Sequence, residues 1–203
     1  MVTYDLDFQY KADRTYVHGT DIFNSVAELI NDRLGLGGFN DINMTLHRII
    51  RNNLSAEVHS GLTQPRPADA AVAISFSDGA GQRHLLFLKE ANRKVTGRYE
   101  YDEDGIIGPA KIDKAGRAVT LETRSPYTDI ELIVALNKGL LKALFPDAAG
   151  KWYFTRLQFD RYSRKTNYKC ITIRLLNHAG LKLTKSSIQF DGVPRGAIYF
   201  SQV

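Results

Sequence analysis

Two segments of this 203-residue sequence, 108 positions apart, carry matching residues at matching spacing. Thr15–Ile22 (TYVHGTDI) and Thr123–Ile130 (TRSPYTDI) share a Thr and a Thr-Asp-Ile triplet. Further matches follow in the same order: Thr45 with Thr155, Arg51 with Arg161, Ile74 with Ile173, and Ala80-Gly81 with Ala179-Gly180. The spacing shortens from 110 to 99 where only the first copy has a polar, proline-bearing loop, Ser60–Asp69. This preserved order predicts a duplicated unit.

Each copy is predicted to begin with a helix. In the first copy, residues 20–34 place apolar side chains on one helical stripe, with Thr20 as the N-cap and Gly35 after the last turn. In the second, Thr128 and Glu131 have the spacing of a capping box. The apolar residues that follow would surround most of that helix, which is typical of a helix buried in an interior.

Strands are expected after each helix, because the period of the apolar residues changes from 3.6 to 2. Two hairpins are predicted at glycine-containing turns, Asp78–Gly81 and Asn177–Gly180. Residues 152–162 are predicted to form a strand whose side chains alternate between its two faces, with Trp152 on one face and Leu157 on the other. The predicted strands are residues 39–50, 71–77, 84–89, 96–101, 106–112, 118–123, 152–162, 170–176, 181–188 and 197–202.

A long buried helix held by one curved antiparallel sheet, present twice, resembles the hot-dog fold in its tandem, double hot-dog form. The resemblance implies an α+β protein made of two hot-dog units, residues 1–104 and 105–203, that pack as one pseudo-dimeric domain. A hot-dog sheet has edge strands that need a partner, and two halves of one chain would supply them to each other. The alternative is a single α+β domain in which the repeat arises by chance.

Hot-dog proteins commonly act on acyl thioesters carried by coenzyme A or by acyl carrier protein, as thioesterases, dehydratases, hydratases or acyltransferases. The resemblance therefore implies such a thioester as substrate, with coenzyme A or phosphopantetheine as its carrier and no separate cofactor. In that superfamily the thioester usually lies between the two units, near the N-terminus of a central helix. Unpaired amides there polarise a carbonyl oxygen, and a histidine or carboxylate moves a proton.

The corresponding segment of this sequence is Tyr16–Asp21. The resemblance implies His18 as a general base or carbonyl-orienting group, with Asp21 or Asn24 positioning water or substrate. The amides of residues 20–22 would bind the developing oxyanion. Further contacts with the acyl group are expected from Tyr16, Gly19, Thr20 and Tyr127, and contacts with phosphates or an acidic carrier from Arg93, Arg98, Arg164 and Lys165.

The segment departs from the family's patterns, and a structural interpretation stands beside the functional one. Many thioesterases have two Asn residues after the histidine, whereas His18 is followed by Gly-Thr-Asp. The second copy has Pro126-Tyr127 in place of His18-Gly19, so one competent site is predicted. The two Thr-Asp pairs would also serve as helix caps, and His18 would equally fit a loop histidine bonded to backbone.

The charge distribution favours an anionic partner without identifying it. The chain has 27 Lys and Arg against 22 Asp and Glu, and residues 151–185 hold nine basic side chains and one acidic. The rival hypothesis is a non-catalytic binding module that presents a basic sheet to an acidic protein or nucleic acid. The same excess of basic residues is also expected if Lys and Arg simply lie on the solvent-exposed faces of the strands. A purely structural pairing protein is the third alternative, and the sequence leaves open whether the chain is an enzyme.

Several classes of protein are excluded or disfavoured. Cys170 is the only cysteine, so no internal disulfide forms and a reducing compartment is favoured. No apolar run is long enough to span a membrane, and Asp5 and Asp7 are foreign to a signal peptide. We expect a cytoplasmic protein, monomeric or homodimeric, with no membrane partner, and nucleic acid is less favoured than acyl-CoA or acyl carrier protein. The other histidines, His47, His59, His84 and His178, lack metal-ligand spacing, so no metal site is predicted.

Overall fold

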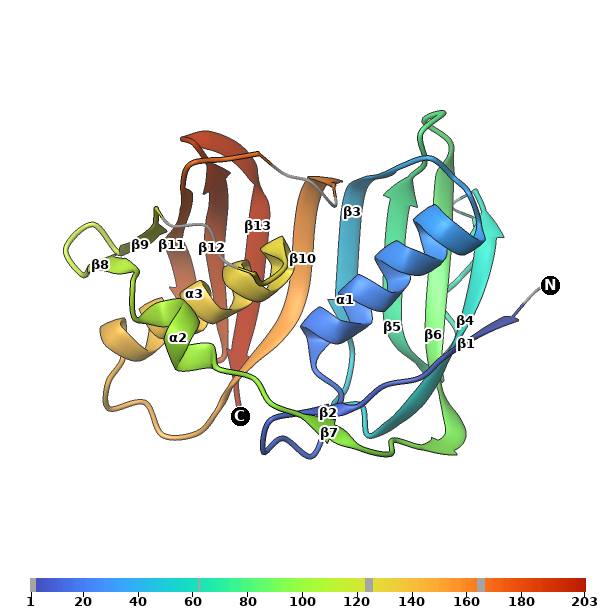
Figure 1. Ribbon diagram of the computed structural model, residues 1–203, viewed down its shortest axis with the longest axis horizontal. Coiled ribbons are helices and arrows are strands. Elements are labelled where there is room, and N and C mark those ends of the chain that lie inside the picture. The colour runs from blue at the N-terminus through green and yellow to red at the C-terminus, as the bar shows by residue number, and fades with distance from the viewer. Residues whose placement is uncertain (1–2, 62, 123–125, 164–166) are drawn as a thin grey trace. The chain divides into compact units, whose positions relative to one another are not determined.

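The computed structural model describes residues 3–61, 63–122, 126–163 and 167–203. The chain divides into two compact units (Figure 1). The first comprises Met1–Tyr101 together with Phe159–Tyr162, and the second comprises Asp102–Gln158 together with Ser163–Val203.

The first unit is a helix packed on an antiparallel sheet. Its elements are β1 (Thr3–Leu6), β2 (Tyr10–Lys11), α1 (Gly19–Glu28), a π-helical turn (Leu29–Arg33), β3 (Phe39–Leu46), β4 (Asn52–Ser60), β5 (Ala70–Ser77), β6 (Arg83–Lys94) and β7 (Arg98–Tyr99). The strand order is β1-β4-β6-β5-β3, and β2 and β7 form a separate parallel pair. Helix α1 lies across one face of this sheet (Figure 1).

The second unit has the same two layers. Its elements are α2 (Glu103–Ile107), β8 (Lys111–Asp113), β9 (Ala118–Leu121), α3 (Asp129–Leu144), β10 (Trp152–Tyr162, of which residues 152–158 belong to this unit), β11 (Ile171–Ala179), β12 (Leu183–Phe190) and β13 (Val193–Gln202). The strand order is β8-β9-β11-β12-β13-β10. Helix α3 covers one face of this sheet (Figure 1).

The core of each unit lies between its helix and its sheet. In the first unit Phe23 of α1 packs on Phe39 of β3, and Phe39 packs edge-on against Phe76 of β5. All three rings are almost fully buried, and each such side chain stabilises the fold by about 1.5–3 kcal/mol. This packing fixes the position of α1 on the sheet.

Helix α3 confirms the prediction of an interior helix. Ten of its residues are buried, from Ile130 to Leu141, and most of them are apolar. The capping box is also confirmed, because the Thr128 side chain accepts the Glu131 amide and the Thr128 amide donates to Glu131 Oε2 at 3.0 Å. Within the described ranges, no helix is long and apolar enough to cross a membrane.

The two sheets differ in connectivity. After α3 the second unit places β11, β12 and β13 side by side, whereas the first unit inserts β6 between β4 and β5. Ser60 at the end of β4 pairs with His84, and Ala70 at the start of β5 pairs with Lys89. Residues 61–69 therefore carry the chain along five residues of β6, about 17 Å of strand. The sequence matches at offset 99 equate β5 with β11, which occupy different sheet positions, so the internal repeat stays a prediction.

Several element boundaries were predicted wrongly. Residues 106–112, expected as a strand, begin in helix α2, because the Asp102 carboxylate accepts the Gly105 amide and caps that helix. The expected strand 96–101 is reduced to β7, and β4 was missed. In β10 the buried residues change parity between Phe154 and Leu157, so the single alternation predicted there is wrong.

Candidate functional site

Helix α1 begins two residues earlier than expected. Its N-cap is His18, whose carbonyl oxygen accepts the amides of Asp21 and Ile22 at 3.0 and 3.2 Å. Just before it, the Val17 amide donates to the Ile50 carbonyl at 2.8 Å and holds the chain extended up to the cap. The prediction of Thr20 as N-cap is therefore wrong. Thr20 is the second residue of the helix, and its hydroxyl does not cap the helix.

This start also changes which amides are available to a ligand. The amides of Asp21 and Ile22, expected in an oxyanion site, are taken by the His18 carbonyl. The first two helix residues, Gly19 and Thr20, have amides that donate to no described residue. Because the first amides of a helix have no partner within it, these two are the groups able to hold an oxygen with partial negative charge.

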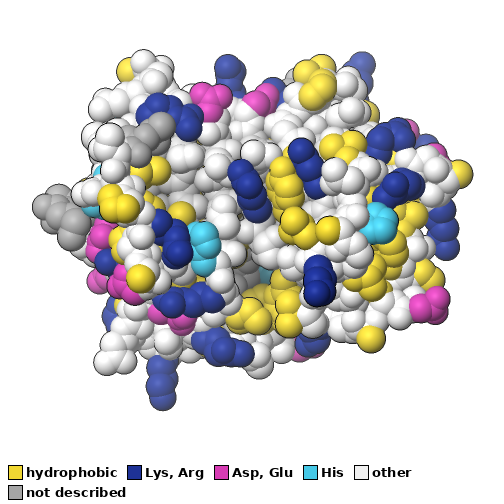
Figure 2. Space-filling view, turned by 180° about the vertical axis from the view of Figure 1, so that it is seen from behind, with side chains coloured by type: hydrophobic (Ala, Val, Ile, Leu, Met, Phe, Trp, Pro, Cys, Tyr) yellow, Lys and Arg dark blue, Asp and Glu magenta, His cyan; other side chains and the backbone are white. Residues whose placement is uncertain are grey.

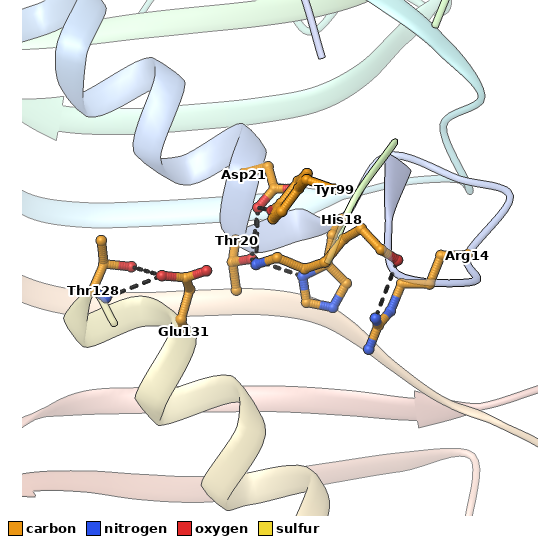
Figure 3. A network of polar contacts seen from close by, with 8 residues as sticks. Arg14, His18, Thr20, Asp21, Tyr99, Thr128 and Glu131 are labelled. Carbon is orange, nitrogen blue, oxygen red and sulfur yellow. Dashed lines mark hydrogen bonds and ion pairs between the residues drawn. The ribbon is translucent and has the colours of Figure 1, made fainter. Parts of the chain in front are cut away.

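The hydroxyl of Thr20 is the centre of a buried polar network (Figure 3). Thr20 Oγ1 lies 2.7 Å from His18 Nδ1, 3.0 Å from Lys11 Nζ and 3.2 Å from Asp21 Oδ1. Thr20 is fully buried and His18 keeps 7% of its surface exposed. The network thus orients the ring of a nearly buried histidine at the start of α1.

Asp21 collects three donors on one carboxylate oxygen. Its Oδ1 accepts from Lys11 Nζ at 3.0 Å and from the Tyr99 hydroxyl at 2.9 Å, in addition to Thr20. The second oxygen, Oδ2, is buried and has no partner among the described residues. Asp21 therefore keeps one acceptor oxygen that a water or a substrate group would satisfy.

Lys11 is buried completely, which is rare for a lysine. Its ammonium lies between the Asp21 carboxylate and the face of the Tyr101 ring, 4.1 Å from the ring centroid. A carboxylate and an aromatic face are the surroundings that stabilise a buried cation. Lys11 and Asp21 therefore form an ion pair between a fully buried lysine and a partly buried carboxylate, and both contact Thr20.

The Thr20 hydroxyl has one proton and two lone pairs, and it lies between two possible acceptors. They are Asp21 Oδ1 at 3.2 Å and His18 Nδ1 at 2.7 Å, while Lys11 donates to the same hydroxyl oxygen. When Nδ1 donates to Thr20, neutral His18 has a lone pair on Nε2, and when Nδ1 accepts, Nε2 holds the proton.

The remaining residues predicted for the site fall into different places. The Tyr16 ring lies 6.4 Å from that of His18, and Asn24 is half-buried on α1. Arg98 donates to the carbonyls of Ala12 and Arg14, so it fastens the segment before α1. Arg93 instead pairs with Asp5 and Asp7. Tyr127, in the second unit, donates to the Asp102 carbonyl, whereas Arg164 and Lys165 lie outside the described residues.

Sequence reasoning missed Lys11 and Tyr99. The two residues are direct neighbours in the parallel pair β2–β7, where Lys11 is opposite Tyr99. They are 88 positions apart, and no periodic pattern connects two strands of two residues each. A lysine is expected at the surface, so nothing in the sequence near Lys11 indicates that it is buried.

The start of α3 has a different set of polar groups. The Tyr168 hydroxyl donates to Asp129 Oδ1 at 2.9 Å. Burial raises the pKa of Tyr168 well above its usual range, and the neighbouring Asp129 charge raises it further. The capping box occupies Thr128 (Figure 3). This helix start therefore has a tyrosine and carboxylate pair where the first unit has a histidine.

A second histidine and carboxylate pair fastens the β5–β6 turn. His84 Nε2 lies 2.9 Å from Asp78 Oδ2, and both residues are buried. Asp78 Oδ1 also accepts the amides of Ala80 and Gln82. The hydrogen bond from His84, followed by these amides, holds the pKa of Asp78 below its ordinary value. Because every acceptor contact closes the turn, this pair has a structural role.

The part of the chain that the structure describes has no cluster of side chains suited to binding a metal ion. No group of three or more His, Cys, Asp or Glu side chains is placed to hold an ion there. Cys170 is half-buried and stands alone.

No protein-family model matches the chain, and no curated protein matches its sequence. Solved structures do match. The dehydratase domain of PpsC from Mycobacterium tuberculosis, in complex with C12:1-CoA, is 9% identical, with 99% of this chain and 92% of that chain covered and a TM-score of 0.51. The tesB protein of Mycobacterium avium subspecies paratuberculosis is 13% identical, with 98% and 91% covered and a TM-score of 0.46.

The likeness to the dehydratase domain confirms the fold. The match covers nearly the whole of both chains, and each unit of this chain has the central helix and antiparallel sheet of a hot-dog unit. The chain therefore has the double hot-dog fold, which confirms the α+β architecture expected from the sequence.

Proposed function

We propose that this protein binds an acyl thioester at the N-terminus of α1 and processes it with His18 as the general base. The observation that carries the proposal is the position of His18 at the N-cap of α1, nearly buried and with its Nδ1 atom 2.7 Å from Thr20 Oγ1, so that Nδ1–H donation to Thr20 would leave Nε2 to act as the base. The match to a dehydratase domain bound to C12:1-CoA supports an acyl thioester as the substrate class.

The helix start supplies the complementary group. The amides of Gly19 and Thr20 would donate to the thioester carbonyl oxygen, where negative charge develops in the transition state. The positive end of the helix dipole favours the same charge. Asp21 Oδ2, the carboxylate oxygen without a partner, would accept from an attacking water or a substrate hydroxyl.

Two reactions begin with a base so placed. In hydrolysis, Nε2 takes a proton from water, the hydroxide adds to the carbonyl carbon, and the C–S bond breaks as the thiolate takes the proton. In dehydration of a 3-hydroxyacyl thioester, Nε2 takes the proton from the carbon next to the carbonyl. The C–O bond at the next carbon then breaks, and water leaves with that proton.

The experiment that tests the proposal presents both reactions to the purified protein. Acyl-CoA and 3-hydroxyacyl-CoA thioesters of increasing chain length are incubated with it. Free thiol reports hydrolysis, and loss of water in the mass spectrum reports dehydration. We expect His18→Gln to abolish the reaction while the melting temperature stays within a few degrees. His47→Gln changes an exposed histidine of the same unit and should keep full activity. Full activity of His18→Gln would refute the proposal.

A second function, binding to an acidic protein without catalysis, rests on a different surface. Arg156 of β10 and Lys185 of β12 both lie over the ring of Tyr199 of β13, 5.4 and 5.7 Å from its centroid. The Tyr199 hydroxyl donates to Gln158. On the side shown in Figure 2, however, Lys and Arg side chains stand apart with apolar and uncharged surface between them. Salt-sensitive binding of an acidic carrier protein with no turnover of any thioester would favour this function.

A further inference from the structure

We propose that the outward face of the second unit's sheet, on the side away from α3, binds single-stranded nucleic acid. The residues that carry the proposal are Arg174, Lys185, Tyr199 and Arg156, which we call the basic row. This face is on the side shown in Figure 2. The proposal goes beyond the proposed function, because it concerns a different surface and its test measures binding without any turnover of thioester.

The pairing of the strands puts the basic row on one face of the sheet. Lys185 of β12 is directly opposite Tyr199 of β13, and Ser187 of β12 is opposite Arg174 of β11. Alternate residues of a strand share a face, so Arg174 and Lys185 are diagonal neighbours about 7 Å apart. The guanidinium of Arg156 in β10 lies over the Tyr199 ring, 5.4 Å from its centroid. The row therefore crosses four adjacent strands in the order β11, β12, β13 and β10.

The positive charge of this face is not balanced by carboxylates on the same strands. Strands β11, β12 and β13 with residues 152–158 of β10 carry no acidic side chain and four basic ones, Arg156, Arg174, Lys185 and Arg195. Among the residues that the structure describes, neither Arg174 nor Lys185 has a carboxylate partner. In the first unit, by contrast, Lys89 lies 3.1 and 3.5 Å from the carboxylates of Glu57 and Asp69. The face of the second sheet therefore favours a partner with several negative charges.

The uncharged residues beside the basic row indicate which polyanion fits. The outward positions of β11 and β12 near the row are Thr172, Ser187 and Gln189. Arg, Lys, Ser, Thr, Gln and Tyr are the side chains that contact phosphate and sugar in nucleic-acid complexes. An antiparallel sheet with an aromatic ring among cations is a common surface for a single strand, because a base can stack there. The centre of a protein–protein interface is instead poor in Lys and Ser, so an acidic protein fits this face less well.

The test measures how binding depends on salt. Fluorescence anisotropy follows a labelled thymidine oligonucleotide as it binds the full chain at a series of salt concentrations. Three phosphate contacts, one for each cation of the row, predict a slope of about −2 for log affinity against log salt. Arg174→Gln and Lys185→Gln should each reduce that slope by about 0.7 and weaken binding several-fold at low salt. An unchanged slope in both variants would overturn the proposal, as would a wild type without salt-dependent binding.

Matched variants separate the charge of the row from the charge and the stability of the whole protein. Lys142→Gln removes an exposed cation from α3, on the other side of the sheet, and should keep the slope of the wild type. Lys185→Arg keeps the charge and should also keep that slope. Arg174 donates to the Gly116 carbonyl as well, so the melting temperature of each variant is compared with that of the wild type. Where Arg174→Gln is less stable, Lys185→Gln decides the test.

A second anion identifies the occupant of the face. Polyglutamate with the same number of charges as the oligonucleotide represents an acidic protein. We expect the oligonucleotide to bind about 10-fold more tightly, because only its bases can stack on the half-buried Tyr199 ring. Tyr199→Leu should remove most of this difference and leave the salt slope of the oligonucleotide unchanged. Equal or tighter binding of polyglutamate by the wild type would overturn the assignment to nucleic acid and favour an acidic protein.

Discussion

Asn137 gives the sharpest prediction about stability. It lies in the middle of helix α3, fully buried, and neither its side-chain nitrogen nor its oxygen has a partner among the described residues. Leucine has the same number and branching of side-chain heavy atoms but no polar group. We therefore expect Asn137→Leu to stabilise the protein.

The magnitude follows from the two effects of the substitution. A buried polar group without a partner costs about 1–3 kcal/mol in measured variants, and the substitution removes that cost. The two methyl groups are larger than the atoms they replace, which costs up to about 1 kcal/mol in a packed core. The net gain in the free energy of unfolding is up to about 3 kcal/mol, and each kcal/mol raises the melting temperature by about 2–4 °C for a chain of this length.

Urea unfolding followed by circular dichroism and by tryptophan fluorescence measures the gain. The matched control is Lys142→Leu, an exposed position on the same helix, which should change stability by less than about 0.5 kcal/mol. A loss of more than about 1 kcal/mol in Asn137→Leu would refute the reasoning. It would mean that the amide makes its hydrogen bonds in the folded protein, for example to an enclosed water.

Three other variants test separate contacts. Thr128→Ala removes the capping box with Glu131 and should lower the free energy of unfolding by about 1 kcal/mol, measured by urea unfolding. Asp78 has a folded pKa below its ordinary value of 3.8, so its pair with His84 stabilises the protein above that pH and loses this effect as pH falls through the lowered pKa. Stability of the wild type should therefore fall more steeply on acidification below about pH 4 than that of Asp78→Asn, and parallel curves would contradict this. Arg93→Ala should leave the calorimetric affinity for coenzyme A unchanged, because its guanidinium is already held by two carboxylates.

Local patterns in the sequence were sufficient for several features of the fold. The capping box needs only Thr128 and Glu131, which lie within four consecutive residues, and the structure has both of its hydrogen bonds. The apolar surround of α3 predicted a buried helix, and the turn at Asp78–Gly81 predicted the β5–β6 hairpin. In each case the interacting residues are close in sequence, so their spacing is enough to predict the contact.

The candidate site was predictable only in part. His18 and Asp21 were placed at the start of a helix, and they are there. The role of Thr20 was missed because the helix begins at His18, and a two-residue shift in a helix start moves a side chain from a cap to a network. Lys11 was missed because only a strand pair joining distant residues brings it to the site. The spacing of residues in the sequence does not predict contacts between such distant segments.

The connection between β4 and β5 affects the order in which the two sheets can assemble. As the chain leaves the ribosome, β11, β12 and β13 emerge in the order in which they pair, so each strand finds its neighbour at once. Strand β4 emerges before β5 and must remain unpaired on one side until β6, its neighbour, has been synthesised. In the second unit β10 likewise waits for its neighbour β13, so each sheet closes only after a strand that is synthesised later has joined it.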